Sequence, residues 1–135
     1  MNTHKTTIPA DLLPQLDTLL MIVSERSGIA IEQLTGTSRK REVVDARRVF
    51  TAMAMKYARF VKQELYRTAY VRPPAFIHIG KFLGNKDHSS IHNLYGKDGQ
   101  TVADMCRYDK TFEQLHASIE YEVTKGYKAP VASEV

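Results

Sequence analysis

The stretch of residues 79 to 94 constrains the fold most, because it combines a turn signal with apolar residues on both sides of it. Gly84 and Asn85 both tolerate positive φ angles, and together they predict a helix end followed by a turn. Apolar residues flank this turn, namely Ile79, Phe82, Leu83, Ile91 and Leu94. The sequence therefore predicts two short helices joined by a tight turn, which is the helix-turn-helix arrangement.

The second helix of this predicted pair begins with side chains that suit contact with DNA bases. In a helix-turn-helix, the N-terminal residues of the second helix reach base edges in the major groove. Lysine donates to guanine, aspartate accepts from cytosine, and serine and histidine pair with several edges. The candidate base-reading residues are Lys86, Asp87, His88, Ser89 and Ser90. The alternative interpretation is a plain helix start, where the helix dipole favours aspartate.

A second candidate region is a basic segment that leads into a long amphipathic helix. It places five cations within ten residues, and these are Arg39, Lys40, Arg41, Arg47 and Arg48. The formal net charge of +4 and the pI of about 9.2 favour a polyanionic partner only weakly. A run of charges is most often a solvated surface, so this segment does not by itself establish nucleic-acid binding.

Both regions resemble one known family. Residues 79–91 read IGKFLGNKDHSSI. They are similar, without a gap, to the signature Ile-Gly-x-x-Phe-Gly-Gly-Arg-Asp-His-Thr-Thr-Val of the C-terminal DNA-binding domain (domain IV) of the bacterial replication initiator DnaA. Residues 31–34 and 38–47 resemble the short helix and the basic loop of that domain. The resemblance implies an all-α fold with a Trp-repressor-like helix-turn-helix.

The resemblance also implies how DNA would be bound through two grooves. By position, Arg39 matches the arginine of the family that enters the minor groove. Arg47 matches a second arginine, which supports contact at the helix start. Phosphate contacts, which set the register without reading sequence, are expected mostly from Lys40, Arg41, Arg47, Arg48 and Asn93. This chain has Ser89 and Ser90 where threonine is usual and Lys86 where arginine is usual, so we expect altered or relaxed specificity.

Apolar periodicity predicts further helices and a single domain over residues 1–126, followed by a flexible tail over 127–135. One amphipathic helix around residues 12–23 ends before Gly28, and a short helix spans 29–34. An inserted segment over 63–74 ends in two prolines, and residues 96–100 form a turn. A last helix over 109–125 is expected to bury Phe112, Leu115, Ile119 and Val123. No strand-like alternation occurs, which indicates an all-α fold.

The sequence argues against several classes of function. No apolar run approaches the roughly 20 residues of a membrane span. The single cysteine, Cys106, allows no internal disulfide and fits a reducing cytoplasm. No phosphate-binding glycine loop or metal-binding spacing is present, so we expect no nucleotide, cofactor, metal or enzymatic activity. Asp87, His88 and Ser89 cannot form a catalytic triad, since adjacent residues of one helical turn point in different directions.

The function predicted from these observations is sequence-specific binding of double-stranded DNA at a DnaA-box-like site, linked to replication initiation or its regulation. The expected location is the cytoplasm, on the nucleoid, and a phage or mobile element is one expected source. One alternative is a protein-interaction module that competes with or accompanies the replication initiator or origin proteins without reading DNA. Another is a structural remnant in a helical assembly, whose basic loop is merely solvated.

Overall fold

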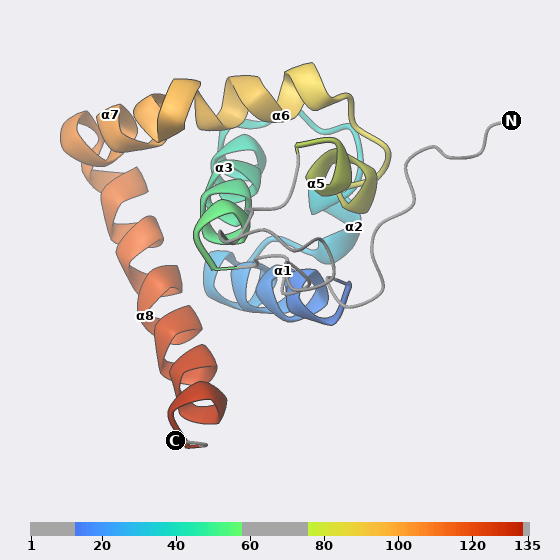
Figure 1. Ribbon diagram of the computed structural model, residues 1–135. Coiled ribbons are helices and arrows are strands. Elements are labelled where there is room, and N and C mark those ends of the chain that lie inside the picture. The colour runs from blue at the N-terminus through green and yellow to red at the C-terminus, as the bar shows by residue number, and fades with distance from the viewer. Residues whose placement is uncertain (1–12, 58–75, 134–135) are drawn as a thin grey trace, which may run out of the picture.

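The computed structural model describes residues 13–57 and 76–133, with side chains over 15–57 and 76–125 (Figure 1). The described residues form helices and no strand, which confirms the all-α prediction. The predicted insertion over 63–74 lies outside the described residues. The helices are α1 (Leu13–Ser27), α2 (Ile31–Leu34), α3 (Arg41–Tyr57), α5 (Phe76–Phe82), α6 (His88–Tyr95), the 3-10 turn η1 (Lys97–Gly99), α7 (Gln100–Tyr108) and α8 (Lys110–Ser133).

The helix α3 lies in the middle of the fold and is in contact with α1, α2, α6, α7 and α8. Its inward side is fully buried at Val49, Phe50 and Met53. The predicted apolar stripe of α1 packs against it, with Leu16, Leu19, Leu20 and Val23 buried. Because apolar residues recur every three or four positions in both helices, each turns one continuous apolar face toward the shared core.

The helix α7 is a finding that the sequence analysis did not predict. Gly96 ends α6 at a φ of 85°, and the turn expected over 96–100 is present. The chain then resumes a helix at Gln100, which buries Val102 and half-buries Met105 and Cys106. These three residues have the i, i+3, i+4 spacing of a helix face, so the signal was present in a segment that the prediction left unassigned.

The last helix is longer than predicted. The expected stripe is confirmed, since Phe112, Ile119 and Val123 are fully buried and Leu115 packs against the core. The helix α8 continues to Ser133, beyond residue 125, where the sequence predicted its end. Once a helix is nucleated, each further residue adds one backbone hydrogen bond, so a well-packed helix extends readily. No helix in the described part of the chain combines the length and apolarity needed to cross a bilayer.

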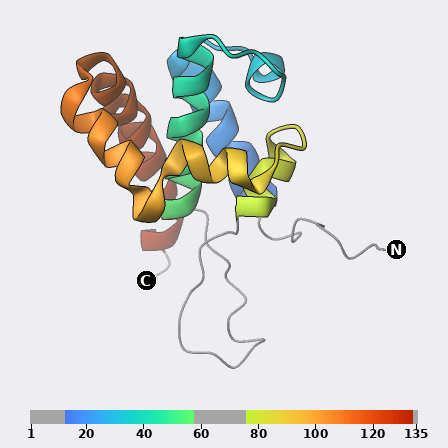
Figure 2. The ribbon, with the colours of Figure 1, turned by 90° about the horizontal axis from the view of Figure 1, so that it is seen from above.

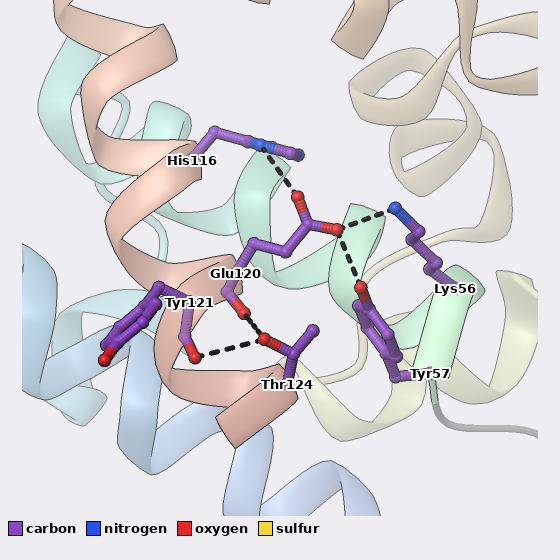
Figure 3. Close-up of polar contacts among 6 residues, drawn as sticks. All are labelled: Lys56, Tyr57, His116, Glu120, Tyr121 and Thr124. Atoms are coloured by element: carbon purple, nitrogen blue, oxygen red, sulfur yellow. Dashed lines mark hydrogen bonds and ion pairs between the residues drawn. The ribbon is translucent and has the colours of Figure 1, made fainter. Parts of the chain in front are cut away.

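Two polar links hold α8 against α3. Near the start of both helices, the guanidinium of Arg41 donates to the carboxylate of Asp109, which also accepts the Phe112 N–H at 3.1 Å. Near the end of α3, Glu120 Oε2 accepts from Lys56 Nζ at 2.6 Å and from the Tyr57 hydroxyl at 2.7 Å (Figure 3). Polar contacts therefore hold α8 against α3 at two positions, in addition to the apolar contacts between them.

A histidine lies beside the second link. His116 Nδ1 is 3.8 Å from Glu120 Oε1, on the same face of α8 (Figure 3). Burial lowers the pKa of His116 and outweighs the attraction of the Glu120 carboxylate, which acts in the opposite direction. Burial raises the pKa of Glu120, but hydrogen bonds from Lys56 and Tyr57 more than offset it, so that pKa is lowered overall. The neutral imidazole and the ionised carboxylate are thus the forms that the fold favours.

These shifts predict a loss of stability between pH 7 and pH 5. A histidine with a lowered pKa in the folded state is protonated first in the unfolded chain, so the free energy of unfolding falls as the pH drops below about 6.5. His78 contributes with the same sign, since burial lowers its pKa too. Each histidine contributes at most about 1.4 kcal/mol per pH unit. Urea denaturation at pH 7, 6 and 5 measures the effect.

The matched variant is His116→Gln, which stays neutral over this range. Its free energy of unfolding should depend on pH less steeply than that of the wild type, and His78 contributes to the slope that remains. Equal slopes for the two proteins would contradict the role given to His116.

Candidate nucleic-acid interface

The helices α5 and α6 are joined by a tight turn over residues 83–87, as the sequence predicts. Gly84 and Asn85 have positive φ angles of 91° and 62°. The Lys86 N–H donates to the Gly80 carbonyl at 2.8 Å and closes the turn. The apolar anchors of the pair point into the core: Ile79, Leu83 and Ile91 are fully buried, and Phe82 and Leu94 pack against them. We call this unit the α5–α6 pair.

The turn of this pair lies directly against the end of α2. A Cβ atom at Gly84 would approach the Thr35 carbonyl oxygen to 2.0 Å. A Cβ atom at Gly80 would approach the Lys86 carbonyl oxygen to 2.1 Å. Neither position has room for a side chain, because a backbone oxygen occupies the space. The two glycines therefore let the turn pack closely against α2 and against α5 itself.

The first turn of α6 presents a polar, exposed face. Asp87 occupies the N-cap position, yet its side chain caps no backbone N–H, and it is 65% exposed. His88 is 64% exposed, and its Nδ1 lies 3.7 Å from the Asp87 carboxylate. The side chains of Ser89, Ser90 and Asn93 are also exposed. Five of the predicted DNA-binding residues thus share the outer surface of α6, while Ile91 anchors the helix from the core side.

Arg47 corrects the sequence-based expectation of a phosphate contact. Its side chain is 5% exposed and directs its guanidinium to backbone carbonyls between α2 and α3. Nε, Nη1 and Nη2 donate at 2.7 to 3.0 Å to the carbonyl oxygens of Gln33, Leu34, Gly36 and Ser38. Burial lowers the pKa of Arg47. The geometry makes this arginine an internal support of the basic loop, defined here as residues 36–40.

Lys86 is a second correction, because its ammonium turns inward rather than toward a base edge. Nζ donates to the Gly36 carbonyl at 2.6 Å and to the Leu83 carbonyl at 2.9 Å. Burial and the nearby positive charge of Arg47 lower the pKa of Lys86. The Gly36 carbonyl also accepts from Arg47 Nη2 at 3.0 Å. One backbone oxygen therefore receives donors from both α3 and the α5–α6 pair.

Arg48 and Arg41, which were expected mostly to hold phosphates, also have partners within the chain. Arg48 is half-buried, and its Nη1 donates at 2.7 Å to the Leu94 carbonyl in the last turn of α6. Burial lowers its pKa. Arg41 remains 72% exposed while it contacts Asp45 at 3.6 Å and Asp109. Arg48 thus positions α6, whereas Arg41 is accessible to an external anion.

The remaining basic residues of the loop, Arg39 and Lys40, are exposed, and neither forms an ion pair with another described residue. The helix α3 begins at Arg41, and the Ser38 hydroxyl before it accepts the Lys40 N–H at 3.3 Å. The sequence analysis did not predict the role of the Gly36 carbonyl as an acceptor, because every residue has a backbone carbonyl and its partners cannot be read from side-chain types. No group of three metal-binding side chains occurs in the described parts of the chain.

The packing of the turn predicts a large effect of Gly84→Ala. The left-handed φ alone costs an L-residue about 1–2 kcal/mol, and the clash with the Thr35 oxygen adds to it. We expect a loss of about 3 kcal/mol or more in the free energy of unfolding, measured by urea denaturation. Gly28→Ala is the matched control, since Gly28 also has a positive φ but nothing lies within 4 Å of its Cβ position. Equal losses for both variants would contradict the close approach to α2.

The contacts of Lys86 predict a stability role that a base-reading lysine would lack. Lys86→Met keeps the aliphatic stem but removes the donor to Gly36 and Leu83, and should cost about 1 kcal/mol of unfolding free energy. Lys81→Met, at an exposed position of α5, is the control and should change stability by less than about 0.5 kcal/mol. A Lys86→Met variant as stable as the wild type would show that the ammonium is not needed at Gly36.

Comparison with known proteins places this geometry in context. The chain is 30% identical over 105 residues to the chromosomal replication initiator protein DnaA of Bacteroides thetaiotaomicron, a match that covers 78% of this chain and 18% of that protein. The identity and coverage are the same for DnaA of Bacteroides fragilis. For DnaA of a Picosynechococcus species the identity is 27%, over 78% of this chain and 20% of that protein.

No family model matches the chain, and no solved structure matches it. The chain spans 18–20% of the length of these curated relatives, so the comparison concerns a DnaA segment rather than the whole initiator. The resemblance predicted from residues 31–47 and 79–91 is nonetheless confirmed: over 78% of its length this chain is similar to the replication initiator DnaA.

Proposed function

We propose that this chain binds double-stranded DNA in a sequence-dependent manner, with the start of α6 in the major groove and the basic loop in the neighbouring minor groove. The observation that carries the proposal is the joint position of two exposed polar surfaces. Contacts of Lys86 and Arg47 with the Gly36 carbonyl hold the loop against the α5–α6 pair. Similarity to proteins named as chromosomal replication initiators supports DNA as the partner.

The base-reading role falls to the exposed residues at the start of α6. Asp87 has unused acceptors for a cytosine amino group, because its carboxylate caps no N–H of the helix. His88, Ser89 and Ser90 offer donors and acceptors on the same turn. Serine in place of threonine lacks the methyl group that packs on thymine, so this helix should prefer a sequence related to a DnaA box but not identical to it.

The basic loop supplies the minor-groove and phosphate contacts. Arg39 is exposed and suits a narrow, A·T-rich minor groove, whose negative potential attracts arginine. Lys40 and Arg41 would hold phosphates on either side, and Asn93 would do so from α6. With Arg47, Arg48 and Lys86 engaged internally, the cations left for phosphate are few. Binding through Arg39, Lys40 and Arg41 alone gives an expected slope of log affinity against log salt of about −3.

The biological setting proposed here follows from the similarity. A DNA-binding segment related to DnaA would act in replication initiation or its regulation, in the cytoplasm and on the nucleoid. It would need no enzymatic activity of its own, since positioning on DNA is its task. Replication initiator and origin proteins are the partners that such a position would bring close.

Two single substitutions separate affinity from specificity. Arg39→Ala should weaken binding to every duplex and lower the salt slope by about 1, because it removes a contact with the backbone and minor groove. His88→Ala should reduce discrimination between a DnaA-box duplex and a scrambled duplex by about 1–3 kcal/mol. Fluorescence anisotropy at two salt concentrations measures both quantities.

Arg26→Ala is the control, because this exposed arginine lies in the last turn of α1, and α1 is on the side of the fold opposite α6 (Figure 1). It should leave discrimination unchanged. If both site variants bind like the wild type, the assignment of these residues is wrong. If the wild type binds neither duplex, the proposal fails, and a pull-down of the initiator after nuclease treatment becomes the relevant test of a protein partner.

A further inference from the structure

The corner between α7 and α8 carries exposed basic and aromatic side chains that neither the fold nor the proposed interface uses. Tyr108 is 77% exposed, the highest exposure among the large apolar side chains of the described residues. The guanidinium of Arg107 lies 6.0 Å from the centre of the Tyr108 ring. Lys110 is exposed at the start of α8. We call Arg107, Tyr108 and Lys110 the α7–α8 corner.

The position of Lys110 runs against the local electrostatics of α8. A cation in the first turn of a helix faces the positive end of the helix dipole, which disfavours it. Asp109 and Glu113 supply the acidic groups that this helix end prefers, and the Asp109 carboxylate is shared with Arg41. Lys110 forms no ion pair with another described residue. A residue that breaks a local rule with no visible gain in stability points to a function.

The corner is continuous with the proposed interface. Arg41, which follows the basic loop, contacts Asp109 between Tyr108 and Lys110. Figure 1 shows α6 and α7 following one another along the same edge of the molecule, and Figure 2, which looks down on that edge, shows α7 turning back toward the start of α3. The basic loop, the start of α6 and the corner therefore lie around one surface.

The distance from the start of α6 suits a second contact along a duplex. The helices α6 and α7 together span about 25 Å at the helical rise of 1.5 Å per residue, and the turn over 96–99 adds at most about 13 Å. One turn of DNA is about 34 Å. The corner therefore lies within about one helical turn of DNA from the start of α6, which is the range of a neighbouring phosphate contact.

From these observations we propose that the α7–α8 corner is an additional phosphate-binding site, in which Arg107, Tyr108 and Lys110 hold the DNA backbone outside the sequence read by α6. Arginine, lysine and the tyrosine hydroxyl are all donors that bind phosphate oxygens. The Arg107 guanidinium and the Tyr108 ring lie next to each other, so both can face the same stretch of backbone. This inference rests on the proposed DNA binding and extends its footprint.

The test is the double variant Arg107→Ala/Lys110→Ala, measured by fluorescence anisotropy in the full chain. It should weaken binding to box and scrambled duplexes equally, by at least about fivefold at low salt, and reduce the salt slope by about 2. On a duplex shortened by one turn, about 10 bp, on the corner side, variant and wild type should bind alike. Tyr108→Phe should retain ring stacking but lose the hydroxyl contact, with a smaller loss of affinity.

Arg26→Ala/Lys125→Ala is the matched control, since it removes the same charge from exposed positions on α1 and on the second half of α8. It should leave the salt slope within about 0.5 of the wild type. If the corner variant binds DNA with the affinity and salt slope of the wild type, the inference is wrong. The His88→Ala variant then still tests the base-reading role of α6. An equal effect of the control variant would also overturn it, because net charge alone would then explain the loss. Failure of the wild type to bind any duplex would remove the proposed function, and this inference with it.

Discussion

The Gly36 carbonyl is the acceptor on which the relative position of the two candidate DNA-contacting surfaces depends. It receives Lys86 Nζ from the turn of the α5–α6 pair and Arg47 Nη2 from α3, at 2.6 and 3.0 Å. Gly84 packs its backbone on Thr35, one residue before it. A shift of the loop would break contacts with two helical units at once. These contacts therefore fix the position of the loop relative to the α5–α6 pair.

Arginine suits the centre of this arrangement for a physical reason. A loop between two helices leaves carbonyl groups without helical partners, and buried carbonyls need donors. The guanidinium of Arg47 carries five N–H groups in a fixed plane and satisfies four carbonyls with one side chain. Burial lowers its pKa, but an arginine pKa begins so high that the side chain stays charged. The guanidinium therefore remains a hydrogen-bond donor to these carbonyls around neutral pH.

The comparison of prediction and structure separates two kinds of information. Apolar spacing located α1, α3, α8 and the α5–α6 pair, because burial of one helix face is a property of the local sequence. The segment of α7 was left unassigned, since the glycine-rich turn before it was interpreted only as the end of one helix and not also as the start of the next. The positive φ angles of Gly84 and Asn85 confirm the predicted turn, because few residues other than glycine and asparagine adopt that conformation.

The local sequence did not predict which basic side chains face solvent and which are buried. Arg39, Arg47 and Arg48 are the same residue type within ten positions, yet the first is exposed, the second is buried and the third holds the end of α6. A long basic side chain can turn inward or outward, and the choice depends on which carbonyls lie within reach from other parts of the chain.

The sequence by itself determined the helical class, the turn of the α5–α6 pair and the polar start of α6, because periodicity and glycine placement act over a few residues. Only the tertiary structure decided which cations face solvent and which support the loop, because the loop carbonyls that accept from Arg47 and Lys86 lie 9 to 50 residues away from them.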